Sequence, residues 1–177
     1  MTTPPAFPAV PPDAAASPFD VLLGEVDRVL GEWRQLVATE PWNRIPHSRL
    51  IDSFPEILPK LFRLARAGET ELGAEVRELV AAAHGTRRRR DGLPLRAVAD
   101  EWTLVQLACW TVLRRHGIAE DAARAALARL DVLIDDAIGV TLRGYYAPEL
   151  DELRGRGLER RANPDDRRSG ESNRRDD

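Results

Sequence analysis

The sequence has few residues of the kinds that build disulfides, metal sites or membrane spans. Its 177 residues include one cysteine, Cys109, and three histidines. One cysteine cannot form a disulfide within the chain, and no Cys/His cluster has the spacing of a structural zinc site. No apolar run approaches the ~20 residues that a membrane-spanning helix needs. The first residues also lack the basic start and apolar segment of a secretory signal, so we expect a soluble cytoplasmic protein with no membrane contact.

The net charge is small, and the sequence lacks recognisable catalytic motifs. The formal net charge is −3, so no overall field favours binding to nucleic acid or to an anionic membrane. The sequence contains no glycine-rich phosphate loop, no serine or cysteine with a plausible base, and no histidine motif for autophosphorylation. Adjacent carboxylates such as Asp135 and Asp136 diverge on a helix, which does not suit acid–base work. The sequence therefore predicts no catalytic residues, no cofactor and no metal.

Helical periodicity covers most of the chain. Residues 1–17 are rich in proline and alanine and are expected to form a disordered tail. Residues 18–147 are expected to form one helical domain. Residues 148–177 carry mixed charges and few apolar residues, so we expect a mostly disordered tail, in which a weak helical pattern resumes as far as Arg161.

The first predicted helix begins at Ser17 and ends near residues 38–40. Serine suits the cap, Pro18 the first helical position, and Asp20 the positive end of the helix dipole. Apolar residues recur along it at spacings of three and four: Phe19, Leu22, Val26, Val29, Trp33 and Leu36. Such a stripe packs either inside the domain or against a second copy of the chain, and the pattern leaves both interpretations open.

The middle of the chain predicts two further helices. Ser53 and Glu56 have the spacing of a capping box, in which each side chain satisfies a backbone amide of the other residue. Apolar residues 57–64 follow as a short helix, and Pro59 should bend it. A third helix is predicted from Glu71 to the end of an arginine run at residues 87–90.

A tight corner follows the arginine run. Gly92 is suited to a left-handed helix cap, and Pro94 can open the next helix. That helix has one apolar stripe and ends at Gly117; the stripe residues are Leu95, Val98, Trp102, Val105, Cys109, Val112 and His116. A last long helix opens at Glu120. No segment has the alternation of a strand, so the predicted fold class is all-α, with five to six helices.

The arginine run is expected to be structural. Consecutive helical residues point about 100° apart, so the four side chains cannot form one nucleic-acid-binding face. They also lie at the C-terminus of a helix, where cations offset the dipole. We expect Arg88 or Arg87 to reach Asp100 or Glu101 across the corner and to pin the two helices together.

The corner also carries a family resemblance. The pattern H-G-x-x-R-x-x-x-G-x-x-L, which begins at His84, is followed by E-W-x-L-V beginning at Glu101. It resembles the N-terminal sensory domain of RsbR-type stressosome proteins and of related sensor histidine kinases, over residues 19–146. The resemblance implies a globin-like helical fold without haem, homodimers formed through this domain, and a role in stress signalling. Where the resembled pattern has an arginine a few residues after the glutamate, this chain has Gln106.

His84 has two possible roles. In a globin-like fold, a helix-borne histidine could be the ligand of a haem iron. A core or corner histidine, bonded to a backbone carbonyl or a carboxylate, is the interpretation that we favour. No other histidine has a suitable spacing to His84.

These patterns predict a stand-alone, non-catalytic sensory or regulatory domain. It would act as a homodimer and through a signalling partner such as a kinase, a phosphatase or a related sensor. The predicted structural corner comprises His84, Arg87, Arg88, Gly92, Glu101 and Trp102. The resemblance favours the Phe19–Leu36 stripe as the dimer interface. The alternative is a haem-binding or small-ligand-binding globin-like protein with His84 as the ligand.

Overall fold

The computed structural model describes residues 17–42 and 53–162, and within these ranges every regular element is helical. The predicted all-α class is therefore confirmed. The elements are α1 (Pro18–Gly24), α2 (Val26–Ala38), α4 (Phe54–Ala67), α5 (Ala74–Leu79), the π-helical segment η1 (Val80–Gly85), α6 (Thr86–Arg90), α7 (Leu95–Arg115), α8 (Glu120–Tyr145) and α9 (Ala147–Ala162). None of these described helices combines the length and apolar character that crossing a bilayer requires.

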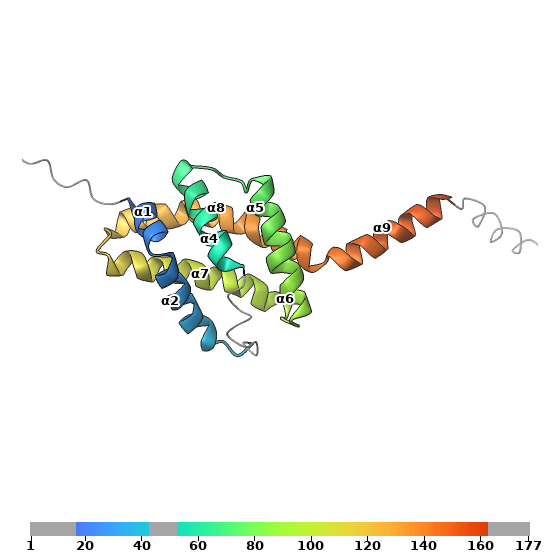
Figure 1. The fold of residues 1–177 in the computed structure, drawn as a ribbon, viewed down its shortest axis with the longest axis horizontal. Helices are drawn as coiled ribbons and strands as arrows, with labels where there is room; N and C mark the ends of the chain where they lie inside the picture. Colours follow the sequence, from blue (N-terminus) through green and yellow to red (C-terminus); the bar gives the residue numbers. More distant parts are fainter. Residues whose placement is uncertain (1–16, 43–52, 163–177) are drawn as a thin grey trace, which may run out of the picture.

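The two longest helices of the body, α7 and α8, lie side by side behind the other helices (Figure 1). Helix α2 packs on α7. Helix α1 contacts both α7 and α8, and α4 packs against α1, α2 and α8. The segments α5, η1 and α6 follow one another as a single rod, and η1 packs on α8. Helix α9 leaves the body at the end of α8 and projects away from it (Figure 1).

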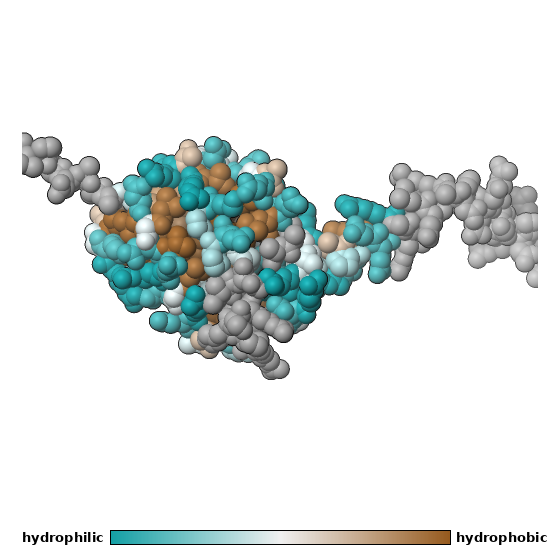
Figure 2. Space-filling view, in the orientation of Figure 1, coloured by the Kyte–Doolittle hydropathy of each residue, from teal (hydrophilic) through white to brown (hydrophobic). Residues whose placement is uncertain are grey.

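Aromatic side chains fill the centre of the body. Trp33 of α2, Phe54 of α4 and Trp102 of α7 are fully buried. The Phe54 ring centroid lies 4.7 Å from that of Trp33 and 5.1 Å from that of Trp102, in edge-to-face arrangements that aromatic quadrupoles favour. The surface is mostly hydrophilic on the face shown in Figure 2, with hydrophobic patches near α1 and between α4 and α5.

The first predicted helix is broken into two. Helix α1 ends at Gly24, and Glu25 has φ −118° and ψ 26°, outside the helical range. The break lets α1 pack on α4 while α2 packs on α7, which one straight helix could not do. Pro18 lies in the first turn as predicted, but the Ser17 side chain makes no capping hydrogen bond.

The third predicted helix also differs from the expectation. It begins at Ala74 rather than Glu71, and the π-helical segment η1 lies in its middle, between α5 and α6. A π turn places an extra residue in the helix and so changes the direction of the side chains that follow it. The continuous periodicity used for the prediction could not reveal this change.

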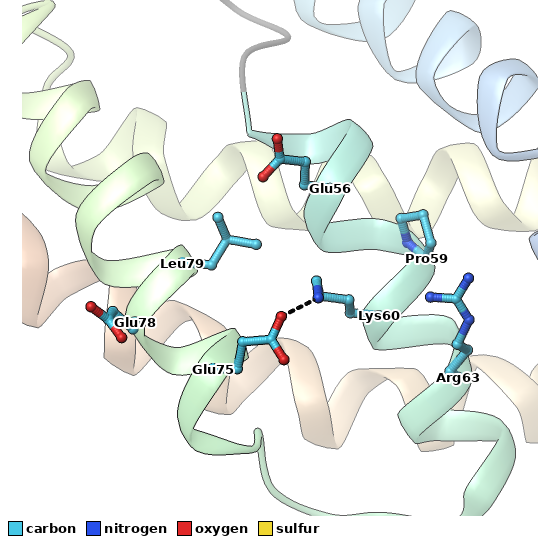
Figure 3. A pocket seen from close by; sticks show the side chains of 7 residues that line it. All are labelled: Glu56, Pro59, Lys60, Arg63, Glu75, Glu78 and Leu79. Carbon is cyan, nitrogen blue, oxygen red and sulfur yellow. Dashed lines mark hydrogen bonds and ion pairs between the residues drawn. The ribbon is translucent and has the colours of Figure 1, made fainter.

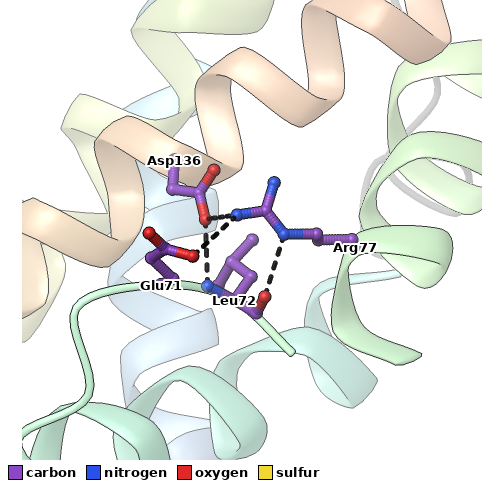
Figure 4. Close-up of polar contacts among 4 residues, drawn as sticks. All are labelled: Glu71, Leu72, Arg77 and Asp136. Atoms are coloured by element: carbon purple, nitrogen blue, oxygen red, sulfur yellow. Dashed lines mark hydrogen bonds and ion pairs between the residues drawn. The ribbon is translucent and has the colours of Figure 1, made fainter. Parts of the chain in front are cut away.

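The loop before α5 is fixed to α8 by one carboxylate (Figure 4). Asp136 Oδ2 accepts hydrogen bonds from the Leu72 backbone amide at 2.9 Å and from Arg77 Nη2 at 2.6 Å. Arg77 Nε in turn donates to the Leu72 carbonyl at 2.9 Å, and Glu71 lies 3.9 Å from Arg77 Nη2. One of the paired aspartates in the sequence is therefore a structural anchor.

The helical pattern that was predicted to resume as far as Arg161 is present as helix α9, residues 147–162, which occupies half of the segment expected to be mostly disordered. Glutamate, leucine, arginine and alanine have high helix propensity, which favours helix even without an apolar face to bury. The predictions for residues 1–16 and 163–177 lie outside the described residues.

Candidate functional site

A buried polar group lies at the corner between η1, α6 and α7. His84, in η1, is fully buried between the rings of Phe54 and Trp102, whose centroids lie 4.8 and 5.3 Å from the imidazole centroid. Its Nδ1 atom lies 3.2 Å from Ser53 Oγ, and its Nε2 atom lies 3.3 Å from Glu101 Oε2. The Nε2 contact has an ion-pair distance but lacks the alignment of a hydrogen bond. The structure thus confirms the interpretation of His84 as a corner histidine beside a carboxylate.

Glu101 is the centre of this group. Arg88 Nε donates a hydrogen bond of 2.9 Å to Glu101 Oε2, and both side chains are buried. Trp33 Nε1 donates to the backbone carbonyl of Glu101 at 3.2 Å, which joins α2 to the same point. The predicted arginine–carboxylate pair across the corner is therefore confirmed as Arg88 with Glu101. Asp100, the other predicted acceptor, lies 3.7 Å from Arg96 Nε.

The corner turns through a left-handed glycine, as predicted. Gly92 has φ 75°, a conformation that side chains with a Cβ rarely adopt. The Leu93 amide donates to the Arg88 carbonyl at 3.0 Å, and the Gly92 amide donates to the Arg89 carbonyl at 2.9 Å. These two hydrogen bonds together form a Schellman-type cap. Arg87, also predicted at the corner, is exposed.

The charges of the group follow from its burial. Burial in the core lowers the pKa of His84, and the nearby Arg88 charge lowers it further, while Glu101 acts in the opposite direction. The neutral imidazole therefore faces a Glu101–Arg88 pair whose charges cancel. In the tautomer that suits both contacts, Nε2 carries the hydrogen beside the carboxylate and Nδ1 accepts from the Ser53 hydroxyl. This tautomer is assigned from the contacts of the two ring nitrogens.

The depressed pKa of His84 predicts a loss of stability in mild acid. Below about pH 6.5 the unfolded chain binds a proton at this histidine, whereas the folded chain resists it because its pKa is lower. The free energy of unfolding should fall with pH below this point, with a slope approaching about 1.4 kcal/mol per pH unit. Urea denaturation at stepped pH measures it. His84→Gln should flatten the slope, and His116→Gln should not, because His116 is partly exposed beside Glu25.

The same corner holds the start of α9. We define the α8–α9 junction as residues 141–149. Thr86 Oγ1 donates to the Gly144 carbonyl at 3.2 Å, and Tyr145 Oη donates to the Leu93 carbonyl at 2.8 Å. Arg89 donates to the Tyr145 carbonyl at 2.9 Å and forms an ion pair with Glu149. Three residues of the corner region therefore contact the root of the projecting helix.

Two adjacent arginines connect the buried group to the junction. Arg88 points inward to Glu101, and Arg89 points outward to Tyr145 and Glu149. Their divergence follows from the 100° step of a helix. Between them they join the interior of the domain to its outermost helix.

A glycine fixes η1 against α8. A Cβ atom built on Gly85 would overlap the Thr141 carbonyl oxygen and would lie 3.0 Å from the Tyr145 amide nitrogen. Real Cβ atoms essentially never come so close to backbone atoms, so this position requires glycine at its present geometry. Because His84 precedes Gly85 in η1, this close approach also brings His84 near the α8–α9 junction.

Ser53, His84 and Glu101 are the residue types of a hydrolytic triad, but their setting does not suit hydrolysis. All three side chains are buried, and Glu101 is already paired with Arg88. A nucleophile must be reachable by the substrate. The groove of about 680 Å³ between α4 and α5 shares no lining residue with this group; Figure 3 shows Lys60 and Glu75 paired across it.

Neither ring nitrogen of His84 is directed at open space. Nδ1 faces Ser53 and Nε2 faces Glu101, so a haem iron would have to displace one of these contacts. Among the described residues, no three His, Cys, Asp or Glu side chains gather in a group that could hold a metal ion. The geometry therefore gives no support to the ligand-binding alternative for His84.

The predicted interface stripe lies mostly inside the domain. Phe19, Leu22, Val29 and Trp33 are buried within the single chain, and Val26 and Leu36 are half-buried against the core. The dimer-interface interpretation of this stripe is therefore corrected. A three–four stripe shows that one face of a helix is covered, but not which element covers it.

Ser53 is the member of the group that the sequence did not reveal. It was expected to cap α4 together with Glu56, but its side chain makes no capping hydrogen bond and faces His84. The spacing of Ser53 and Glu56 is the same whether Ser53 caps the helix or contacts a distant side chain, and the contact with His84 joins positions 31 residues apart.

Comparisons with protein-family models, with curated proteins and with solved structures return no match to this chain.

Proposed function

We propose that the chain is a non-catalytic sensory or regulatory domain of bacterial signal transduction, in which the interior and a projecting helix are joined by one corner. The corner motif from His84 to Val105 supports a relationship to RsbR-type sensory domains, and so a globin-like arrangement without haem and a cytoplasmic stress response. The observation that carries the proposal is the pair Arg88 and Arg89, which links the buried Glu101 to the root of α9. The output would pass along α9 to a partner.

Tyr146, at the end of α8, and Leu150 and Leu153 of α9 form a partly exposed apolar stripe, in which the Tyr146 ring also contacts the ring of Tyr145. Tyr146, Leu150 and Leu153 are 41%, 39% and 62% exposed, at spacings of four and three. Hydrophobic surface is visible at the root of this helix (Figure 2). Over residues 147–154, whose side chains the structure describes, α9 buries no side chain, and a short helix without a buried face is marginal in water. Acidic and basic residues flank the stripe, as they do in paired helices. We therefore propose that the stripe packs against α9 of a second copy of the chain.

The double variant Leu150→Glu/Leu153→Glu is expected to convert the homodimer into a monomer, because four like charges would meet in the paired stripe. Sedimentation equilibrium at micromolar concentrations measures the change. Leu107→Glu is the matched control: Leu107 is 46% exposed on α7, away from α9, and its change should leave the dimer intact. A wild-type protein that stays monomeric, or a dimer lost only in Leu107→Glu, would refute this assignment.

The signalling role itself is tested by identifying the class of protein that binds the chain. The wild-type chain and the α9 double variant would be used as baits in the native host, and bound proteins identified by mass spectrometry. Recovery of a sensor kinase, a phosphatase or a related sensor by the wild type alone supports the proposal. Recovery of metabolic enzymes, or equal recovery by both baits, contradicts it.

A further inference from the structure

We propose that protonation of His84 displaces Arg88 from Glu101 and thereby loosens the α8–α9 junction, so that the domain responds to mild acidification. The inference rests on the proposed signalling function and names one input for it. It differs from a plain loss of stability, because the change is directed to one place. The steps are a change of charge in the core, the release of one arginine, and the loss of the contacts made by its neighbour.

The first step follows from counting charges. With a neutral imidazole, Glu101 and Arg88 cancel, and the buried group has no net charge. With a protonated imidazole, two cations face the same carboxylate oxygen, since His84 Nε2 and Arg88 Nε both lie against Glu101 Oε2. An uncompensated charge in such a site is strongly unfavourable. The group must therefore either reject the proton or release one cation.

The described residues around His84 offer the extra proton no other counter-charge. At the start of α4 the imidazole meets the hydroxyl of Ser53, the residue before the helix, and the Phe54 ring, and from α7 it meets Glu101 and the Trp102 ring. Helix α6 contributes Arg88, and α8 presents the backbone of Thr141 beside Gly85. Among the described residues, Glu101 and Arg88 are the charged groups that act on His84.

Arg88 is the cation that can leave. His84 is held in η1, whose last residue, Gly85, is pressed against the α8 backbone. Arg88 belongs to a five-residue helix that ends at the corner, and its neighbours Arg87 and Arg90 are exposed. Its long side chain can carry its charge into water. Its departure leaves a compensated His84–Glu101 pair behind.

The release of Arg88 reaches α9 through Arg89. Turning α6 outward enough to expose Arg88 also turns Arg89 away from the Tyr145 carbonyl and Glu149. The root of α9 would then keep fewer of its contacts with the corner.

The two tyrosines of the chain provide a direct probe. Tyr145 and Tyr146 are the only tyrosines in the sequence, and both lie in the junction. Protein labelled with 3-fluorotyrosine therefore gives two ¹⁹F signals, both from the region of interest. We would titrate it from about pH 7.5 to pH 5 and follow His84 protonation in parallel by imidazole ¹H–¹³C spectra. Circular dichroism would confirm that the helices remain folded.

The expected result is a shift of the Tyr145 signal with the same midpoint as His84 protonation. Arg89→Gln should place the signal at its acidic position at every pH while His84 still titrates. His84→Gln should abolish the shift, and His116→Gln should leave it unchanged. The proposal is overturned if His84 titrates without a change at Tyr145, if the shift persists in His84→Gln, or if His84 stays neutral until the helices melt. Each outcome is independent of the dimer test, which is done at neutral pH.

Discussion

Gly85→Ala is expected to destabilise the domain by about 3 kcal/mol or more, at the upper end of what overpacking does. The new methyl group would overlap the Thr141 carbonyl oxygen and crowd the Tyr145 amide nitrogen, both of which belong to the backbone of α8. Backbone atoms in the middle of a packed helix cannot move aside as a flexible side chain can. Relief requires η1 to separate from α8, which would also open the space around His84. Urea denaturation followed by circular dichroism measures the loss.

Gly139→Ala is the matched control for this substitution. Gly139 lies in the same helix α8, and a Cβ atom added there meets nothing within 4 Å. Alanine is the better helix former, so this variant should gain about 0.5–1 kcal/mol. If Gly85→Ala were as stable as Gly139→Ala, η1 and α8 would not be in the close contact described above. A loss in both variants would point to a general sensitivity of α8 instead.

The sequence predicted the parts of the site that depend on local geometry. Gly92 after a run of arginines indicates a tight turn, and a turn of that kind brings the end of one helix beside the first turns of the next. Arg88 or Arg87 was therefore expected to reach Asp100 or Glu101, and the pair that forms is Arg88 with Glu101, 13 residues apart. The place of His84 beside a carboxylate followed from the same corner.

The parts that the sequence did not predict depend on distant contacts or on a change of helical register. Gly85 looks like an ordinary helix break, yet its role is set by Thr141, and the π turn leaves no mark in the apolar periodicity. Trp33 lies on a stripe whose pattern would be the same in a core or in an interface. Only the position of α7, which receives its indole hydrogen bond at Glu101, decides between them.

Arg88→Met is expected to lower the free energy of unfolding by about 3–5 kcal/mol at neutral pH, because it leaves the buried Glu101 carboxylate without its cation. Glu101→Leu should cause a comparable loss by stranding Arg88. The double variant Arg88→Met/Glu101→Leu should recover most of the loss, because an apolar pair of similar volume needs no counter-charge. Additive losses in the double variant would show that Arg88 and Glu101 contribute independently and are not a pair.

The pH dependence of Arg88→Met separates an electrostatic loss from a loss of packing. Arg88 is one of the causes that lower the pKa of His84, so its removal should raise that pKa while Glu101 still favours the protonated form. Burial still lowers the pKa of His84 in the variant, but by less than in the presence of the Arg88 charge. The wild type should therefore lose stability between about pH 7 and pH 5.5, and Arg88→Met should lose less over the same range. Parallel curves for the two proteins would mean that Arg88 acts through its volume alone, and that His84 does not sense its charge.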